Sequence, residues 1–127
     1  MTVWIDEPIW PAHGRLFAHL VSDTSYDELH AVARAARLHP RSFDGDHYDV
    51  PDARWQSAVE AGAIPTSGVD LARRLNASGL RLRKRKRDRG VRRILDVSFP
   101  NGASDVDLVA SDDPLDHPRV SAAMVFV

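Results

Sequence analysis

The spacing of apolar residues divides the chain into short strands and amphipathic helices. Residues 2–5 are β-branched or aromatic and predict a first strand. Prolines and a glycine within residues 8–14 predict a loop, and the apolar run 16–21 is too short to assign from periodicity. Residues 42–43 are a further candidate strand, and the glycine-containing stretch 44–46 predicts a loop.

Three helices are expected, each with its own start or stop signal. Ser25 and Glu28 form a capping box for the first helix, which should end at His39-Pro40 because the residue before proline avoids the α region. The second helix is expected after Pro51, and Gly62 should end it. The third is expected from a cap at Ser67, with Asp70 at N3, to Gly79. The predicted apolar faces comprise Leu29, Val32, Ala33 and Ala36, then Trp55, Ala58 and Val59, then Leu71, Ala72 and Leu75.

Strand-like patterns return in the last third of the chain. Residues 91–99 predict a strand closed by a turn at 100–102, and residues 105–109 alternate between polar and apolar. Residues 120–127 predict a C-terminal strand that joins the sheet or mediates homo-oligomer formation. The expected fold is a small single-domain α/β or α+β protein with a short-stranded central sheet, about three helices and C-terminal strands from residues 91–127.

Composition narrows the class of protein. A chain of 127 residues is one domain, or one domain plus a tail. No apolar run is long enough to span a membrane, and the N-terminus lacks the pattern of a secretory signal. The absence of cysteine excludes disulfides, thiolate zinc sites and a cysteine nucleophile. We therefore expect a cytoplasmic protein with no membrane association.

The net charge of −1 conceals a strongly basic segment. Residues 73–93 carry eleven Lys and Arg against one Asp, while the segments on both sides of them are acidic. Such a strip can bind an anion, or it can be a solvated segment that folds back on its acidic flanks. The candidate nucleic-acid-binding residues are Arg73, Arg74, Arg81, Arg83, Lys84, Arg85, Lys86 and Arg87.

Histidine and aspartate are concentrated between residues 6 and 51, which hold five of the six histidines. Imidazole and carboxylate together suit a divalent transition metal, and histidine titrates near neutral pH, as a general acid or base must. The candidate catalytic residues are His13, Arg15, His19, His47 and Asp49. The candidate metal ligands are His13, His19, Asp44, Asp46 and His47.

Roles within this cluster follow from side-chain chemistry. Arg15 would hold an anionic group with its planar guanidinium, and Asp46 or Asp49 would orient a histidine or complete a metal shell. The chain has no His-Glu-x-x-His motif, no Gly-x-Ser-x-Gly elbow and no phosphate-cradling glycine loop. The alternative is that the histidines are partly buried and hydrogen-bond neighbouring aspartates without any ligand.

Four ordered motifs resemble the bacterial and phage domain-of-unknown-function family 4031, over roughly residues 1–87. The resemblance is carried by Trp10-Pro11-x-His13-Gly14-Arg15, His19 to Asp23, Glu28-Leu29-His30 and Phe43 to Pro51. It implies a core domain of residues 1–87 that contains the His/Asp site, and an extension of residues 88–127 packed on the same domain. It implies no activity, cofactor or catalytic residue.

The leading functional hypothesis is a small enzyme acting on a phosphate-bearing substrate, either a nucleotide or RNA. The chemistry would be hydrolysis of a phosphate ester or a glycosidic bond, with or without a metal. The alternative is a non-enzymatic nucleic-acid-binding or adaptor module that uses the strip 73–93. The helices expected near 52–61 and 67–78 have rough helix-turn-helix spacing and would support it. A third possibility is a structural partner subunit with an apolar patch near the C-terminal strand.

Overall fold

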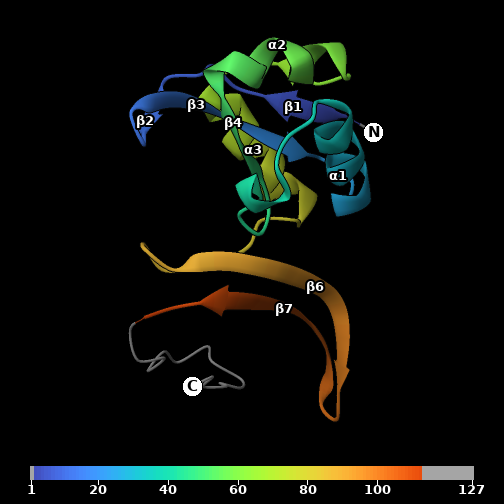
Figure 1. The fold of residues 1–127 in the computed structure, drawn as a ribbon. Coiled ribbons are helices and arrows are strands. Elements are labelled where there is room, and N and C mark those ends of the chain that lie inside the picture. Colours follow the sequence, from blue (N-terminus) through green and yellow to red (C-terminus); the bar gives the residue numbers. More distant parts are fainter. Residues whose placement is uncertain (1, 113–127) are drawn as a thin grey trace.

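A computed structural model describes residues 2–112 of the protein, which form a helix-covered sheet and a separate β-hairpin (Figure 1). The described residues contain three α-helices and seven strands in two sheets, so the predicted α+β class is confirmed. In chain order the elements are β1 (Val3–Ile5), β2 (Trp10–Ala12), β3 (Arg15–Ser22), α1 (Tyr26–Ala35), a 3-10 turn (Pro40–Ser42), β4 (Tyr48–Pro51), α2 (Asp52–Glu60), β5 (Ile64–Pro65), α3 (Gly68–Ser78), β6 (Arg89–Phe99) and β7 (Gly102–Ala110).

Strand β3 is the centre of the first sheet. It pairs antiparallel with β4 along one edge, and with β1 and β2 in succession along the other edge. Strand β5 pairs with β1 in the parallel orientation and so adds a strand to the sheet beyond β1. The predicted loop over residues 8–14 is therefore wrong in part, because β2 and β3 form a hairpin. Its two-residue turn is made by His13 and Gly14, both at positive φ (50° and 73°), and β2 tolerates Pro11 because it lies at the sheet edge.

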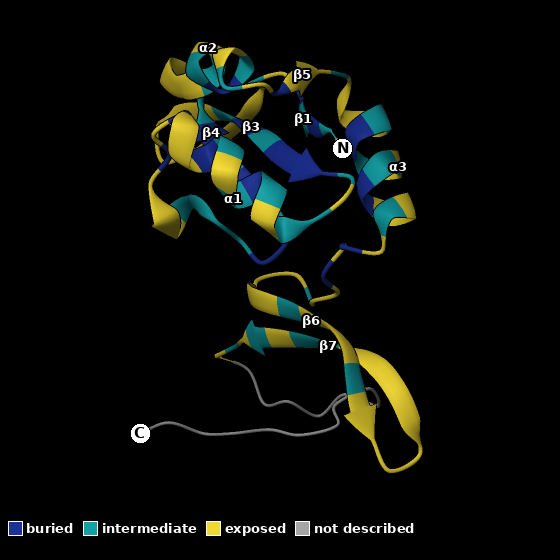
Figure 2. Ribbon diagram, turned by 90° about the vertical axis from the view of Figure 1, so that its right-hand side faces the viewer, coloured by how far each residue is buried: buried dark blue, intermediate teal, exposed yellow. Residues whose placement is uncertain are grey.

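Side chains of β3 alternate between two hydrophobic clusters on the two faces of the sheet. Ala18 and Leu20 are fully buried in the larger cluster, to which α1 and α2 contribute. Val21 points the other way, into a smaller cluster with Leu71 and Leu75 of α3. His19 shares the face of Val21 but is only half-buried, because α3 covers part of that face (Figure 2).

The predicted start of the first helix is confirmed, with one change in the capping box. The Oγ of Ser25 accepts the backbone N–H of Glu28 at 3.1 Å. The Glu28 carboxylate does not return to the Ser25 N–H. It accepts the hydroxyl of Ser22 at 2.6 Å, and that hydroxyl accepts the Ser25 N–H at 3.1 Å. Ser22 therefore completes the cap.

The first helix ends earlier than the sequence predicts. Its last residue is Ala35, and Arg37 adopts a left-handed conformation (φ 59°) before the expected His39-Pro40 boundary is reached. The candidate strand at residues 42–43 reduces to a single bridge between Phe43 and Tyr48. The loop at 44–46 is confirmed.

The second and third helices begin and end as expected, but they do not form a helix-turn-helix unit. Pro51 precedes α2, while Ser67 caps α3 by accepting the Asp70 N–H at 3.1 Å, and Gly79 ends α3 with φ 77°. Strand β5 separates the two helices, and they belong to different hydrophobic clusters, α2 with α1 and α3 on the opposite face. The helix-turn-helix spacing in the sequence is not realised.

The strands expected between residues 91 and 109 are present as β6 and β7, which pair with each other in a second sheet. Most of this hairpin is exposed; Val91 and Leu95 are 51% and 47% exposed. The strand predicted for 120–127, with its proposed role in association, lies outside the described residues. Among residues 2–112, no helix combines the length and apolar composition that crossing a bilayer requires.

Candidate metal centre

Two strands and the loop before one of them bring His19, His47 and Asp49 together. His19 of β3 lies directly opposite Asp49 of β4 in the antiparallel register, so their side chains share one face of the sheet. His47 precedes Asp49 by two residues and points to the same side. One ligand atom from each of the three residues lies within 4.8 Å of the others. We call these three residues the triad.

The ring of His19 is held in place by a buried carboxylate. Nδ1 of His19 lies 2.9 Å from Oδ2 of Asp6, and the backbone N–H of His19 donates to Oδ1 of Asp6 at 2.6 Å. Asp6 is only 2% exposed, and its carboxylate also accepts the indole N–H of Trp10 at 3.3 Å. These contacts engage Nδ1 and leave Nε2 without a partner among residues 2–112, so Nε2 is the His19 atom available to a ligand.

The ring of His47 lies between two carboxylates. Nδ1 is 2.6 Å from Oδ1 of Asp46, and Nε2 is 3.2 Å from Oδ1 of Asp49. Burial lowers the pKa of His47, but the hydrogen bonds to the two carboxylates outweigh burial and raise the pKa to about 9. Burial raises the pKa of Asp49, and the hydrogen bond and charge of His47 more than offset this, so the pKa falls below its usual value.

Two imidazoles and one carboxylate form a donor set that suits zinc, iron, manganese or nickel. His47 and Asp49 would hold such a cation, and His47 would have to lose a proton to bind it. Asp6 and Asp46 would not be ligands but would orient the two rings, as carboxylates next to metal-binding histidines do. Three protein ligands would leave room for water and a substrate on the cation.

The structure gathers some of the predicted site residues and separates others. Asp46 touches the triad through His47, whereas Asp44 accepts the backbone N–H of Gly90 at 2.8 Å. His13 is exposed in the β2–β3 turn, and Arg15 at the start of β3 is about 13 Å from His19 along the strand. Neither belongs to the triad, so a role for them in metal binding finds no support in this geometry.

Asp6 is the site residue that the sequence patterns did not single out. Its signals in the sequence are its place at the start of the stretch rich in histidine and aspartate and its position directly after a predicted strand. An open cleft of about 860 Å³ adjoins this residue and is also lined by Trp10 and Trp55. The indole N–H of Trp55 donates to the backbone carbonyl of Asp6 at 2.8 Å. Trp10 is 48% exposed, and its ring centroid lies 5.5 Å from that of His19.

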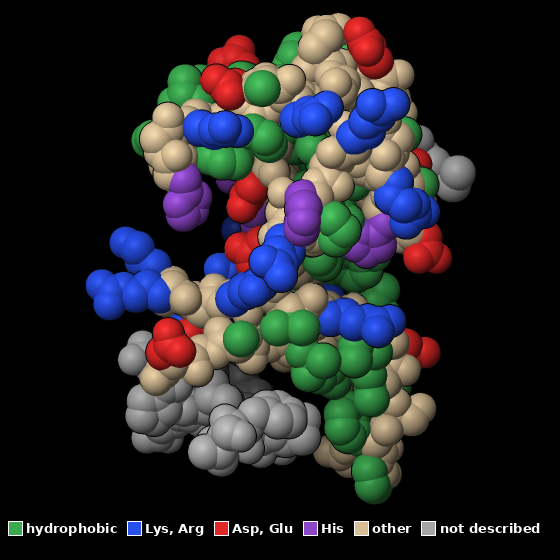
Figure 3. All heavy atoms as spheres, viewed as in Figure 1, with side chains coloured by type: hydrophobic (Ala, Val, Ile, Leu, Met, Phe, Trp, Pro, Cys, Tyr) green, Lys and Arg blue, Asp and Glu red, His purple; other side chains and the backbone are tan. Residues whose placement is uncertain are grey.

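The basic strip is divided among α3, the loop that follows it and the first residues of β6. Arg74 pairs with Asp70 at 2.7 Å and lies over the ring of Trp4. Most basic side chains of the loop are exposed, and Lys84 lies 3.8 Å from Asp44. Figure 3 shows Lys and Arg side chains below a recess that contains acidic and histidine side chains, between the helix-covered sheet and the hairpin.

These features define a small α+β protein whose sheet carries a cluster of two histidines and one aspartate. Residues 3–78 match the family described as "Protein of unknown function (DUF4031)", and the chain belongs to this family. The matched segment ends with α3, earlier than the expected residue 87, and contains the whole triad. Searches of curated proteins and of solved structures found no match.

Proposed function

We propose that this protein is a divalent-metal-dependent enzyme that hydrolyses phosphate esters, with His19, His47 and Asp49 as metal ligands. The observation that carries the proposal is the paired support of the two imidazoles, by Asp6 on His19 and by Asp46 on His47. Carboxylates in this position fix the tautomer and orientation of a metal-binding histidine and increase its basicity. If the two histidines bound no ligand and were only hydrogen-bonded to neighbours, each ring would not need its own buried carboxylate.

A divalent cation in this position would activate a water molecule and polarise a phosphoryl oxygen. In the net reaction the oxygen of water bonds to phosphorus and one ester P–O bond breaks. The departing oxygen leaves with one proton of the water molecule, and the second proton goes to the phosphate product or to solvent. The triad supplies the ligands, and Asp6 and Asp46 keep its rings in position.

Positive charge beside the triad favours an anionic substrate. Lys84 lies 3.8 Å from Asp44, in the loop that leads directly into His47. The neighbouring residues 81–87 add further exposed Lys and Arg side chains. A phosphate ester bound at the triad would therefore meet a complementary electrostatic potential.

The second candidate function is a non-enzymatic nucleic-acid-binding or adaptor module. The observation that favours it is the exposure of the basic side chains in the loop after α3. It predicts salt-dependent binding to nucleic acid that substitutions in the triad leave unchanged.

Metal titration tests the proposed function. Protein prepared without a polyhistidine tag and treated with a chelator is titrated with Co²⁺ and followed by visible absorption, with Zn²⁺ as a competitor. We expect one ion per chain, with loss of that site in His19→Ala and its retention in His39→Ala, which removes an exposed histidine outside the triad. Equal titrations for the wild type and His19→Ala would refute the proposal.

Hydrolysis of bis(p-nitrophenyl) phosphate by the loaded protein is the second readout. We expect activity that depends on the added metal and disappears in His19→Ala and Asp49→Asn but not in His39→Ala. Metal binding without hydrolysis of this diester or of p-nitrophenyl phosphate, the matching monoester, would support the metal site and reject the assigned reaction.

A further inference from the structure

The segment of residues 81–92 concentrates positive charge that the rest of the described chain does not neutralise. It contains eight Lys and Arg against one Asp, a net charge of +7. Arg85 pairs with Asp88 at 3.0 Å, and Lys84 lies near Asp44. The other six side chains are exposed and make no ion pair with residues 2–112. They are Arg81, Arg83, Lys86, Arg87, Arg89 and Arg92.

The backbone of this segment is anchored at both ends. Leu82 is buried and donates its N–H to Oδ2 of Asp46 at 2.7 Å, and Gly90 donates its N–H to Oδ1 of Asp44 at 2.8 Å. A Cβ on Gly45 would lie 3.0 Å from the Cα of Gly90, so the two glycines pack against each other directly. The cations therefore project from a docked loop and from the first residues of β6, which distinguishes this segment from a solvated tail.

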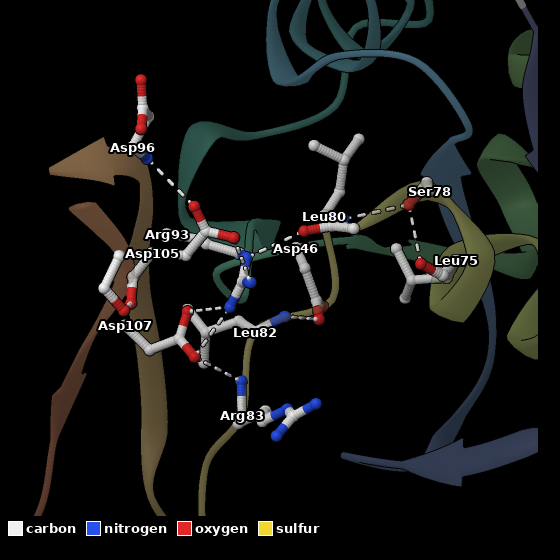
Figure 4. Close-up of polar contacts among 12 residues, drawn as sticks. Asp46, Leu75, Ser78, Leu80, Leu82, Arg83, Arg93, Asp96, Asp105 and Asp107 are labelled. Atoms are coloured by element: carbon white, nitrogen blue, oxygen red, sulfur yellow. Dashed lines mark hydrogen bonds and ion pairs between the residues drawn. The ribbon is translucent and has the colours of Figure 1, made fainter. Parts of the chain in front are cut away.

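The hairpin that follows is attached to the same region by Arg93. Its guanidinium bonds the carboxylates of Asp105 and Asp107, at 3.0 and 2.8 Å, and the carbonyl of Gly79 at 2.9 Å (Figure 4). The hydroxyl of Tyr26 also donates to the carbonyl of Leu80. The two acidic residues of β7 are thus committed to Arg93 and do not pair with the six exposed cations named above.

The anchored loop and the triad share one carboxylate. Asp46 holds Leu82 with Oδ2 and His47 with Oδ1, so a single side chain links the basic loop to the proposed metal ligand. On the other side of the triad, the exposed ring of Trp10 lies next to His19. The basic loop therefore adjoins the triad through Asp46, and the triad adjoins the ring of Trp10 through His19.

We propose that the substrate is a single-stranded nucleic acid. Its phosphates lie along the exposed cations of residues 81–92, one base stacks on Trp10, and the phosphodiester to be cleaved lies at His19, His47 and Asp49. Six unpaired cations exceed what one nucleotide needs, and base stacking on Trp10 requires a base that is not paired in a duplex. This inference rests on the proposed function for the cleavage step, whereas strand binding can be measured without metal.

Fluorescence anisotropy in EDTA measures strand binding without turnover. The probe is a fluorescein-labelled oligonucleotide of about 16 nucleotides, near the upper end of single-strand site sizes, as RNA and DNA and as the matched duplexes. The variant Lys86→Gln/Arg87→Gln/Arg89→Gln is compared with Arg37→Gln/Arg41→Gln/Arg54→Gln. The second variant removes the same charge from exposed positions outside the segment.

We expect the segment variant to bind more weakly and to reduce the slope of log K against log salt by about 2, roughly 0.7 for each phosphate that is no longer neutralised. Trp10→Ala should weaken single-strand binding about 5- to 100-fold, and Trp10→Phe should keep most of it, because the stacking surface remains. Equal weakening in the two triple variants, or equal affinity for duplex and single strand, would overturn the inference.

Cleavage assays separate this inference from the proposed function. With Co²⁺ or Zn²⁺, the wild type should cut the single strand, and His19→Ala should bind it but not cut it. Hydrolysis of bis(p-nitrophenyl) phosphate without binding or cleavage of the oligonucleotide overturns the nucleic-acid substrate and keeps the proposed function. Tight, salt-dependent strand binding with no metal bound overturns the proposed function and, with it, the assignment of the strand as a substrate.

Discussion

Asp46 contacts His47 and the backbone of Leu82 with its two carboxylate oxygens, at 2.6 and 2.7 Å. One buried side chain, 7% exposed, thereby joins the orientation of a candidate metal ligand to the docking of the basic loop. Residues 46 and 82 lie 36 positions apart in sequence, and the hydrogen bond between them is buried, which strengthens it.

Asp46→Asn should lower metal affinity about 10- to 100-fold, the usual effect of removing a carboxylate that supports a metal-binding histidine. The amide carries no charge and cannot accept from His47 and Leu82 with both of its polar atoms. Isothermal titration with Zn²⁺ measures the change. Asp27→Asn, on an exposed position of α1, is the matched control and should leave affinity unchanged. Unaltered affinity in Asp46→Asn would show that His47 does not depend on this contact.

Gly45→Ala should destabilise the protein more than Gly14→Ala, although both glycines have nearly the same positive φ (77° and 73°). Each substitution costs about 1 to 2 kcal/mol for a left-handed residue with a Cβ. At Gly45 the new Cβ would also lie 2.7 Å from Cδ1 of Leu82 and 3.0 Å from Cα of Gly90, which adds about 1 to 3 kcal/mol. At Gly14 nothing lies within 4 Å.

Urea denaturation of the two glycine variants under identical conditions gives the comparison. Equal free energies of unfolding would mean that the loop of residues 80–90 does not pack against Gly45 in solution. That result would also contradict the anchoring of residues 81–92 against the loop that contains Gly45.

Ser22→Ala should lower the free energy of unfolding by about 1 to 3 kcal/mol, because it leaves the Glu28 carboxylate and two partly buried backbone N–H groups without their partner. Ser22 is 1% exposed, and its hydroxyl donates to Glu28 at 2.6 Å and accepts the N–H groups of Thr24 and Ser25 at 3.0 and 3.1 Å. Chemical denaturation of Ser104→Ala, at an exposed position of β7, provides the control and should show a change below about 0.5 kcal/mol. Similar values for the two variants would contradict the role of Ser22 in capping α1.

The free energy of unfolding should decrease as the pH falls, because His30 resists protonation in the folded protein. Burial lowers the pKa of His30 below its ordinary value of 6.5, and the positive charge of Arg34 lowers it further. A group whose folded-state pKa is depressed in this way, by disfavouring the cationic form, binds a proton more readily in the unfolded chain. Its stabilising effect is present above pH 6.5 and is lost as the pH falls through the folded-state pKa.

The measurement is urea denaturation in EDTA between pH 8 and pH 5 for the wild type and His30→Gln. Because glutamine does not titrate, the free energy of unfolding of the wild type should fall relative to that of the variant over this interval. A difference that stays constant, or changes in the opposite direction, would show that burial and the charge of Arg34 do not disfavour protonation of His30 in the folded protein.

Local signals in the sequence were sufficient for the starts of the three helices, for the ends of the second and third, and for the last hairpin. The caps at Ser25 and Ser67 and the stop at Gly79 act within four residues of each helix end, so they can be read without knowledge of the fold. The alternation in residues 105–109 likewise predicted β7. The density of histidine and aspartate located the candidate site to residues 6–51, and the match to the family agrees with the resemblance drawn from the same motifs.

Only the tertiary structure decided which of those side chains meet. The antiparallel register of β3 and β4 sets His19 opposite Asp49, and a shift of one residue would turn one of them to the opposite face. The β1–β3 pairing brings Asp6 to His19, while the two-residue turn carries His13 away from the triad. Helix and turn signals are short-range and are encoded in neighbouring residues, whereas strand register depends on burial across the whole sheet, which no local pattern specifies.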